Sequence, residues 1–168
     1  MPSVPVSAAS VDGRRLRIYA ETMHTNYDTD IVAWAAEQAR LIRAGRFDQV
    51  DLEHIAEEIE DVGKSEQREL ANRMAVLLAH LLKWLHQPER RGSSWDSTLR
   101  EQRKALARRL QKTPSLQHCL NDKEWWEDAW LDARTEAARE TGIGFDRYPD
   151  VCPWTSAEIL SSDWLPSN

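Results

Sequence analysis

DLEHIAEEIEDVGKSEQRELANRMAVLLAHLLKW, residues 51–84, is the stretch that decides the fold of this chain. Its first part, Asp51–Asp61, carries six carboxylates and no Lys or Arg. Its second part, Met74–Leu85, is apolar except for His80 and Lys83. The two parts therefore make different demands on their surroundings.

The apolar part predicts a helix that is buried on several sides. At 100° per residue, one side of the helix consists of Leu70, Met74, Leu77, Leu78, Leu81, Leu82 and Leu85. Neighbouring alanines widen this side beyond half of the circumference, whereas a surface helix shows an apolar stripe about 100° wide. We therefore expect Ser65–His86 to be the buried central helix of an all-α helical bundle.

The acidic part has a narrower apolar stripe with the i, i+3, i+4, i+7 spacing of a helix. The stripe consists of Leu52, Ile55, Ala56, Ile59 and Val62. Gly63 followed by Ser65 is typical of a helix end and a new N-cap. We therefore predict two helices, Asp51–Gly63 and Ser65–His86, with a break between them; the alternative is a kink in one long helix.

Apolar periodicity and capping residues indicate the other helices. They are expected at Tyr27–Ala44, Trp95–Lys112, Ser115–Leu120 and Lys123–Thr141, with a last short helix after the capping box Thr155–Glu158. The fold class is thus a bundle of four longer helices plus short ones, in a single domain over residues 27–166. Residues 1–26 have no periodicity and predict an N-terminal tail or arm, in which Arg14–Met23 is a candidate for docking on the body or on a second subunit.

The composition excludes several classes of protein. The 168 residues have a net charge of −6 and include only two cysteines, which are too few for a disulfide framework. No apolar run reaches the roughly 18 residues of a membrane helix, so we expect no membrane association and a cytoplasmic location. The eight tryptophans indicate core and interface packing.

Carboxylates and a histidine form the first candidate site. Helical di-metal proteins bind their metals with Glu and His side chains that project inward from several helices. Glu57, Glu58, Asp61 and His80 are therefore a candidate metal site of a hydrolase or oxidase, or a structural charge network with Lys83 and the basic residues that follow. The charge network is the preferred interpretation, so neither a metal nor another cofactor is predicted.

A basic segment follows the central helix. Residues 88–112 contain eight Lys or Arg and three acids, a net charge of +5. Arg100–Arg109 could follow the phosphates of a nucleic acid. The acidic chain would repel a nucleic acid at long range, and the acidic helix offers these cations an internal partner. Nucleic-acid binding is therefore the less favoured alternative.

The loop QPERRGSSW, residues 87–95, forms the preferred candidate surface with the end of the central helix. Guanidinium groups, hydroxyls and a ring at a helix N-terminus can bind an anion or a carboxylate. A capped turn whose arginines bind helix ends is the structural alternative. The residues of this surface are His80, Lys83, Trp84, His86, Arg90, Arg91 and Trp95.

The order of these segments resembles the bacterial domain of unknown function 29 family. The resemblance is carried by the runs YDTDIVAWAAEQARLIRAGRFDQVDLEHIAEEIEDVGKSEQREL, LLAHLLKW, QPERRGSSW, LREQR, TPSL, ARTEAARETG and YPDVCPWT. It covers roughly residues 27–166 and implies an all-helical fold, but no activity.

The functional hypothesis is a non-catalytic interaction protein that binds a partner protein or forms a homo-oligomer through Trp- and Ala-rich helix faces. No catalytic motif supports an enzyme, because the chain lacks a Gly-rich phosphate loop and a nucleophile elbow. Cys119 and Cys152 also lack an adjacent histidine–acid arrangement.

Overall fold

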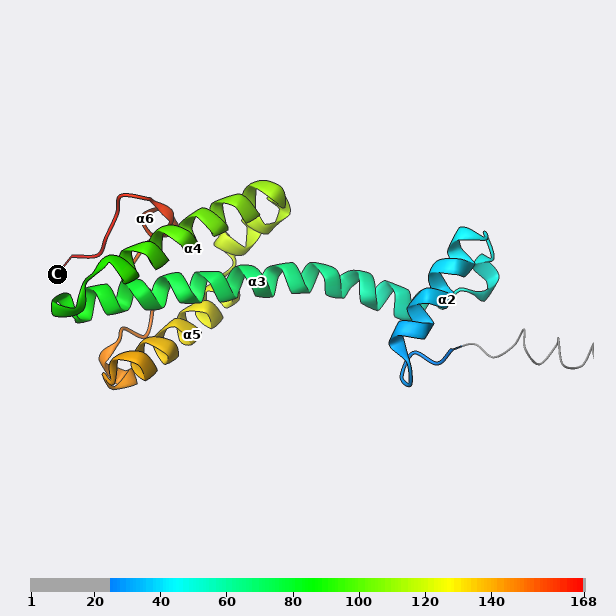
Figure 1. Cartoon of the computed structure of the whole chain (residues 1–168), viewed down its shortest axis with the longest axis horizontal. Helices are drawn as coiled ribbons and strands as arrows, with labels where there is room; N and C mark the ends of the chain where they lie inside the picture. The colour runs from blue at the N-terminus through cyan, green and yellow to red at the C-terminus, as the bar shows by residue number, and fades with distance from the viewer. Residues whose placement is uncertain (1–24, 168) are drawn as a thin grey trace, which may run out of the picture. The chain divides into compact units, whose positions relative to one another are not determined.

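The computed structural model describes residues 25–167, which contain helices and no strand (Figure 1). The all-α prediction is therefore confirmed. These residues form two compact units that divide between Ile59 and Glu60, inside the predicted domain 27–166. The arm Arg14–Met23 and most of the predicted tail lie outside the described residues. None of the helices in residues 25–167 has the length and apolar character needed to span a membrane.

The first unit is built on α2, Ile31–Arg43, the 3-10 turn η1, Phe47–Gln49, and the start of α3. α2 begins four residues later than the predicted Tyr27, because the Asp30 side chain accepts a hydrogen bond from the Ala33 amide and caps the helix. The buried residues of α2 are Trp34, Gln38 and Leu41.

α3 is one continuous helix, Leu52–His86, so the predicted break at Gly63 is wrong. A glycine that ends a helix commonly adopts a positive φ. Among the described residues only Gly45 and Gly142 do so, and Gly63 keeps helical geometry. Gly63 and Ser65 are both exposed, and the helix passes through them without a cap.

Gly63→Ala is expected to stabilise the protein by about 0.5–1 kcal/mol, because alanine loses less conformational freedom in a helix. A Cβ added at Gly63 meets no atom within 4 Å. Urea unfolding followed by helical circular dichroism measures the effect. Gly142→Ala is the control and should destabilise, because Gly142 has a φ of +74°. A loss of stability in Gly63→Ala would contradict the continuous helix.

The second unit is a helical bundle in which α4, Ser93–Lys112, and α5, Lys123–Thr141, lie along the C-terminal half of α3 (Figure 1). Leu77 and Leu81 of α3 are completely buried, which confirms the predicted central helix. The core of this unit also contains Leu99 and Leu106 of α4. α5 contributes Ala129, Trp130, Ala133 and Ala137.

The helix ends in this unit follow their capping residues with two exceptions. Asp122 caps α5 and Gly142 ends it, and Thr155 forms the predicted capping box of α6, Ser156–Leu160. The predicted start of α4 at Trp95 is wrong, because the helix begins two residues earlier, at Ser93, and Gly92 occupies the N-cap position without a side-chain bond. The predicted helix Ser115–Leu120 is a 3-10 segment, η3, Pro114–Asn121.

Arg103 of α4 fixes the C-terminal segment of the chain. This arginine is buried, and its guanidinium donates hydrogen bonds to the carbonyls of Ile159 (2.9 Å), Ser162 (3.3 Å) and Trp164 (2.7 Å). One side chain of the predicted basic surface is therefore a structural element of the bundle. Its position places the segment after α6 against α4.

Candidate functional site

His80 and Lys83 of the preferred candidate surface are held in a polar cluster inside the second unit. Lys83 is buried and forms an ion pair with Glu140 of α5. Its ammonium lies 3.3 Å from His80 Nε2 and 5.0 Å from the centre of the Trp95 ring. His80 Nδ1 lies 2.9 Å from the Val76 carbonyl, and burial lowers the pKa of His80. This histidine is therefore a neutral acceptor for the ammonium.

The other residues of that surface are divided between structural contacts and solvent. Arg91 is exposed, donates to the Trp84 carbonyl at 2.8 Å and stacks its guanidinium over the Trp84 ring. His86 packs edge-on against Tyr148, and burial lowers its pKa. Arg90 is exposed. The structure therefore brings His80, Lys83 and Trp95 together, but as a closed ion-pair cluster.

The predicted carboxylate and histidine set does not converge. Asp61 and His80 are separated by 19 residues of one helix, about 28 Å at 1.5 Å per residue. Glu57 and Glu58 belong to the first unit, where Glu58 accepts a hydrogen bond from the Tyr27 hydroxyl at 2.6 Å. Within residues 25–167 no group of three or more His, Cys, Asp or Glu is placed to hold a metal ion.

A polar and aromatic cluster in the first unit surrounds Asp51. The Asp51 carboxylate lies 2.7 Å from His54 Nδ1 and accepts a hydrogen bond from Trp34 Nε1 at 3.2 Å. The Tyr27 ring stacks on His54 at 4.2 Å. The hydrogen bond with Asp51 raises the pKa of His54. Burial alone would raise the pKa of Asp51, but its hydrogen bonds with His54 and Trp34 bring that pKa below its ordinary value.

Raising the pH is expected to weaken the first unit through His54. Because the folded pKa of His54 is raised above 6.5, its stabilising contribution is complete below that pH and is lost as the pH rises through the folded value. A two-dimensional NMR titration of the imidazole measures this pKa in the intact chain. Asp51→Asn should bring it back toward 6.5, and an unchanged pKa in that variant would contradict the role of Asp51.

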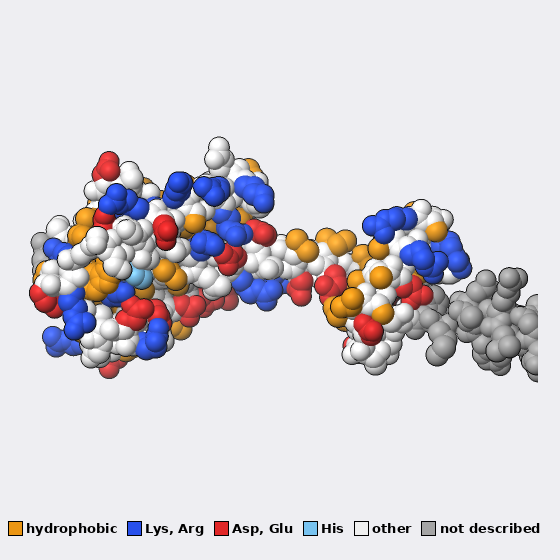
Figure 2. All heavy atoms as spheres, in the orientation of Figure 1, with side chains coloured by type: hydrophobic (Ala, Val, Ile, Leu, Met, Phe, Trp, Pro, Cys, Tyr) orange, Lys and Arg blue, Asp and Glu red, His pale blue; other side chains and the backbone are white. Residues whose placement is uncertain are grey.

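The basic helix α4 is largely paired within the second unit. Arg100 pairs with Asp96 one turn away, Arg103 is buried, and Arg109 forms ion pairs with Glu66 and Glu69 of α3. Figure 2 shows that positive side chains nevertheless gather over the C-terminal part of α4. The cations that could follow a phosphate backbone are therefore fewer than the sequence suggests.

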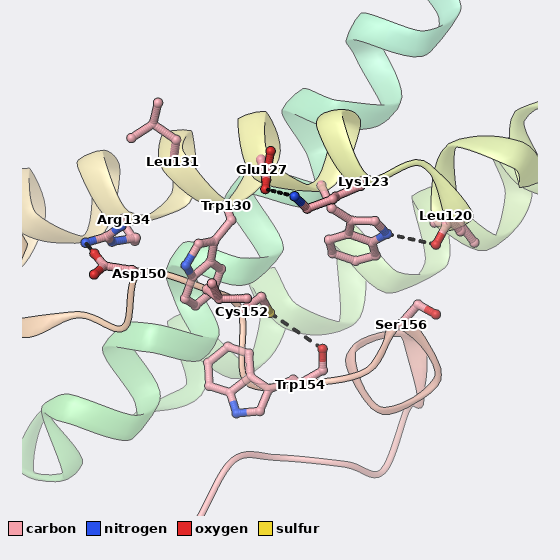
Figure 3. A pocket seen from close by; sticks show the side chains of 12 residues that line it. Leu120, Lys123, Glu127, Trp130, Leu131, Arg134, Asp150, Cys152, Trp154 and Ser156 are labelled. Carbon is pink, nitrogen blue, oxygen red and sulfur yellow. Dashed lines mark hydrogen bonds and ion pairs between the residues drawn. The ribbon is translucent and has the colours of Figure 1, made fainter.

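One cavity in the described part of the chain was not found from the sequence. It has a volume of about 600 Å³ and lies in the second unit, between α5 and residues 150–156 (Figure 3). Three indole rings line it, those of Trp126, Trp130 and Trp154. Leu131 and Val151 also line it and are 51% and 78% exposed, so the cavity opens to solvent.

Two of the three indole N–H groups around this cavity are bonded to the protein. Trp126 Nε1 donates to the Leu120 carbonyl at 2.8 Å, and Trp130 Nε1 donates to the Pro149 carbonyl at 2.9 Å. The charged residues of the wall form two ion pairs. They are Lys123 with Glu127 at 3.2 Å and Arg134 with Asp150 at 2.9 Å (Figure 3). The cavity wall therefore consists mainly of apolar rings and ion-paired charges, and Arg134 Nε is buried without a hydrogen-bond partner among the described residues.

Cys152 is the only thiol among the residues that line the cavity, and it is not activated. Its Sγ donates to the Trp154 carbonyl at 3.6 Å, and burial raises its pKa. A thiol with a raised pKa is a weak nucleophile, because the thiolate is the reactive form. No histidine lines the cavity.

Part of this site was visible in the sequence. Trp126 and Trp130 are four residues apart and were assigned to the packing face of the helix at 123–141. Trp130 is buried, whereas Trp126 is only half-buried. Trp154 follows an irregular segment, and periodicity does not show where such a segment packs. The number of tryptophans was the one available signal.

Comparison with known proteins gives a single match. The model of the family described as "Domain of unknown function DUF29" matches residues 26–165. The chain belongs to the DUF29 family. No curated protein and no solved structure matches this DUF29 chain. The matched range contains the tryptophan-lined cavity and part of each compact unit.

Proposed function

We propose that this DUF29 protein is a non-catalytic interaction protein whose tryptophan-lined cavity receives an apolar group of a partner protein. The observation that carries the proposal is the cavity of about 600 Å³ between α5 and residues 150–156. This volume falls in the range of ligand pockets, about 300–1,000 Å³. Hydrophobic side chains that anchor protein interfaces bury themselves in pockets of this kind.

The state of the lining supports binding over catalysis. The N–H groups of Trp126 and Trp130 and the two ion pairs of the wall are satisfied by the protein itself. A polar ligand would have to break these bonds or leave its own groups unpaired, at a cost of about 1–3 kcal/mol for each group. An apolar group meets no such cost and gains about 25 cal/mol for each Å² that it buries.

A second copy of the chain is one partner to test, but it does not bind through the alanine face proposed from the sequence. Ala129, Ala133 and Ala137 are completely buried in the core of their own unit. Light scattering over a range of protein concentrations separates self-association from the binding of a different protein. A mass that stays monomeric at high concentration would leave a different protein as the partner.

An anionic dye with apolar aromatic rings is expected to bind the cavity with one dominant site. The probe is 8-anilino-1-naphthalenesulfonate, followed by its own fluorescence. Leu131→Glu should weaken its binding at least about tenfold, because a carboxylate then lies in the wall of an apolar pocket. Leu131 is 51% exposed, so this change should leave the fold intact.

Leu52→Glu is the matched control, because Leu52 is 67% exposed and lies in the other unit. Its dye affinity should equal that of the unaltered chain. Equal affinity in Leu131→Glu would overturn the proposal for the cavity.

Stoichiometric zinc, iron or manganese in the purified protein would favour the metal-enzyme alternative. Nucleic-acid binding that weakens steeply with salt would favour the adaptor alternative.

A further inference from the structure

The first half of α3 carries an apolar surface that no described residue covers. Leu52, Ala56 and Ile59 have the i, i+4, i+7 spacing of one helix face, which we call the α3 stripe. Leu52 and Ile59 are 67% and 68% exposed, and Ala56 is exposed as well. Figure 2 shows hydrophobic side chains facing solvent on this part of α3, next to acidic ones.

The charge beside the α3 stripe restricts what can cover it. Glu53 and Glu57 are exposed, and no described residue forms an ion pair with either. Glu60 is 3.8 Å from Lys64, which is itself exposed. If a second copy of the α3 stripe covered the first, the carboxylates of the two copies would face each other and repel. A segment with apolar and cationic side chains is complementary to both features.

We propose that the α3 stripe is covered by residues 14–19 of the same chain, whose sequence is RRLRIY. These residues lie outside the described ones. Their sequence supplies three arginines for the carboxylates of Glu53, Glu57 and Glu60, together with Leu16, Ile18 and Tyr19 for the apolar face. This inference is independent of the cavity, which lies in the other unit.

The described residues that follow this segment hold the chain beside α3. The Thr25 amide donates to Glu37 at 2.8 Å, and the Tyr27 ring stacks on His54 of α3. Residues 20–24 connect this anchor to Tyr19 and span up to about 17 Å when extended. A helix with its side chains is about 10–12 Å in diameter, so the α3 stripe is within reach. A short tether also gives an effective concentration in the millimolar range.

Hydrogen exchange of the full chain tests the proposal. In the unaltered protein, amides of residues 52–60 should be protected, because the covered helix opens less often. Arg14→Glu with Arg17→Glu should make these amides exchange at least about tenfold faster. Combining that pair with Glu53→Arg and Glu57→Arg should restore the protection, because the charges are complementary again.

The matched control is Arg68→Glu with Arg108→Glu, which changes the net charge equally at two exposed arginines of the second unit. Exchange of residues 52–60 should not change in this control. The proposal is overturned if Arg14→Glu with Arg17→Glu leaves that exchange unchanged. It is also overturned if the protection rises with protein concentration, because a second copy would then be the occupant. A dye affinity unchanged in the Arg14 and Arg17 variant shows that the cavity is unaffected.

Discussion

Arg103→Ala is expected to destabilise the second unit by about 3 kcal/mol. The buried guanidinium donates to the carbonyls of Ile159, Ser162 and Trp164. A hydrogen bond from a charged group contributes about 1.5–3 kcal/mol, and the desolvation of Arg103 offsets part of the three bonds. Burial disfavours the charged form of Arg103 and lowers its pKa. The stabilisation therefore comes from the hydrogen bonds and not from placing a charge at this position.

Tryptophan fluorescence during urea unfolding measures this effect, since seven of the eight tryptophans lie in the second unit. The melting temperature should fall by about 10 °C. Arg100→Ala is the control on the same helix, because Arg100 forms only a surface ion pair with Asp96. Such pairs contribute about 0–1 kcal/mol. Similar losses in the two variants would show that the carbonyl contacts do not hold the C-terminal segment.

Leu81→Ala is expected to have a comparable or larger effect, about 3–4 kcal/mol. Leu81 is completely buried at the centre of the core of the second unit. The truncation removes three carbon atoms and leaves a cavity that neighbouring helices fill only in part, and substitutions of this type cost about 2–5 kcal/mol. The total stability of such a protein is about 5–15 kcal/mol, so a large fraction is lost.

Val76→Ala provides the comparison for the buried leucine. Val76 lies on the same helix but is 36% exposed, so its truncation removes less buried surface. We expect a loss below about 1 kcal/mol. Unfolding by urea, again followed by tryptophan fluorescence, compares the two variants. A loss as large in Val76→Ala as in Leu81→Ala would contradict the assignment of the buried face of α3.

The bundle could be predicted because its helices follow local rules that tertiary contacts do not overrule. The limits of α5, Lys123–Thr141, were predicted from a cap at Asn121 or Asp122 and from Gly142, and the structure confirms both limits with Asp122 as the cap. Gly63 has the same residue type as Gly142 but keeps helical geometry within α3. A glycine permits the left-handed conformation without requiring it, so the residue alone could not decide between an end and a continuation.

The candidate site was less predictable, because it depends on which segments meet. His80, Lys83 and Trp95 were assigned to one surface, and the structure does bring them together. The ion pair of the buried Lys83 with Glu140 could not be foreseen, since nothing in the sequence shows that α5 supplies that carboxylate. For the same reason the tryptophan cavity was missed, because its wall at Trp154 comes from an irregular segment.

The attachment of the C-terminal segment connects α4 to the wall of the tryptophan-lined cavity. Arg103 holds the Trp164 carbonyl, the Trp164 ring packs against Trp154 at 5.7 Å, and Trp154 packs against Trp130 at the same distance. Arg103, which does not line the cavity, is thereby connected to Trp154 and Trp130, which do. Substitutions on α4 can therefore reshape the cavity at a distance, while every lining residue keeps its identity.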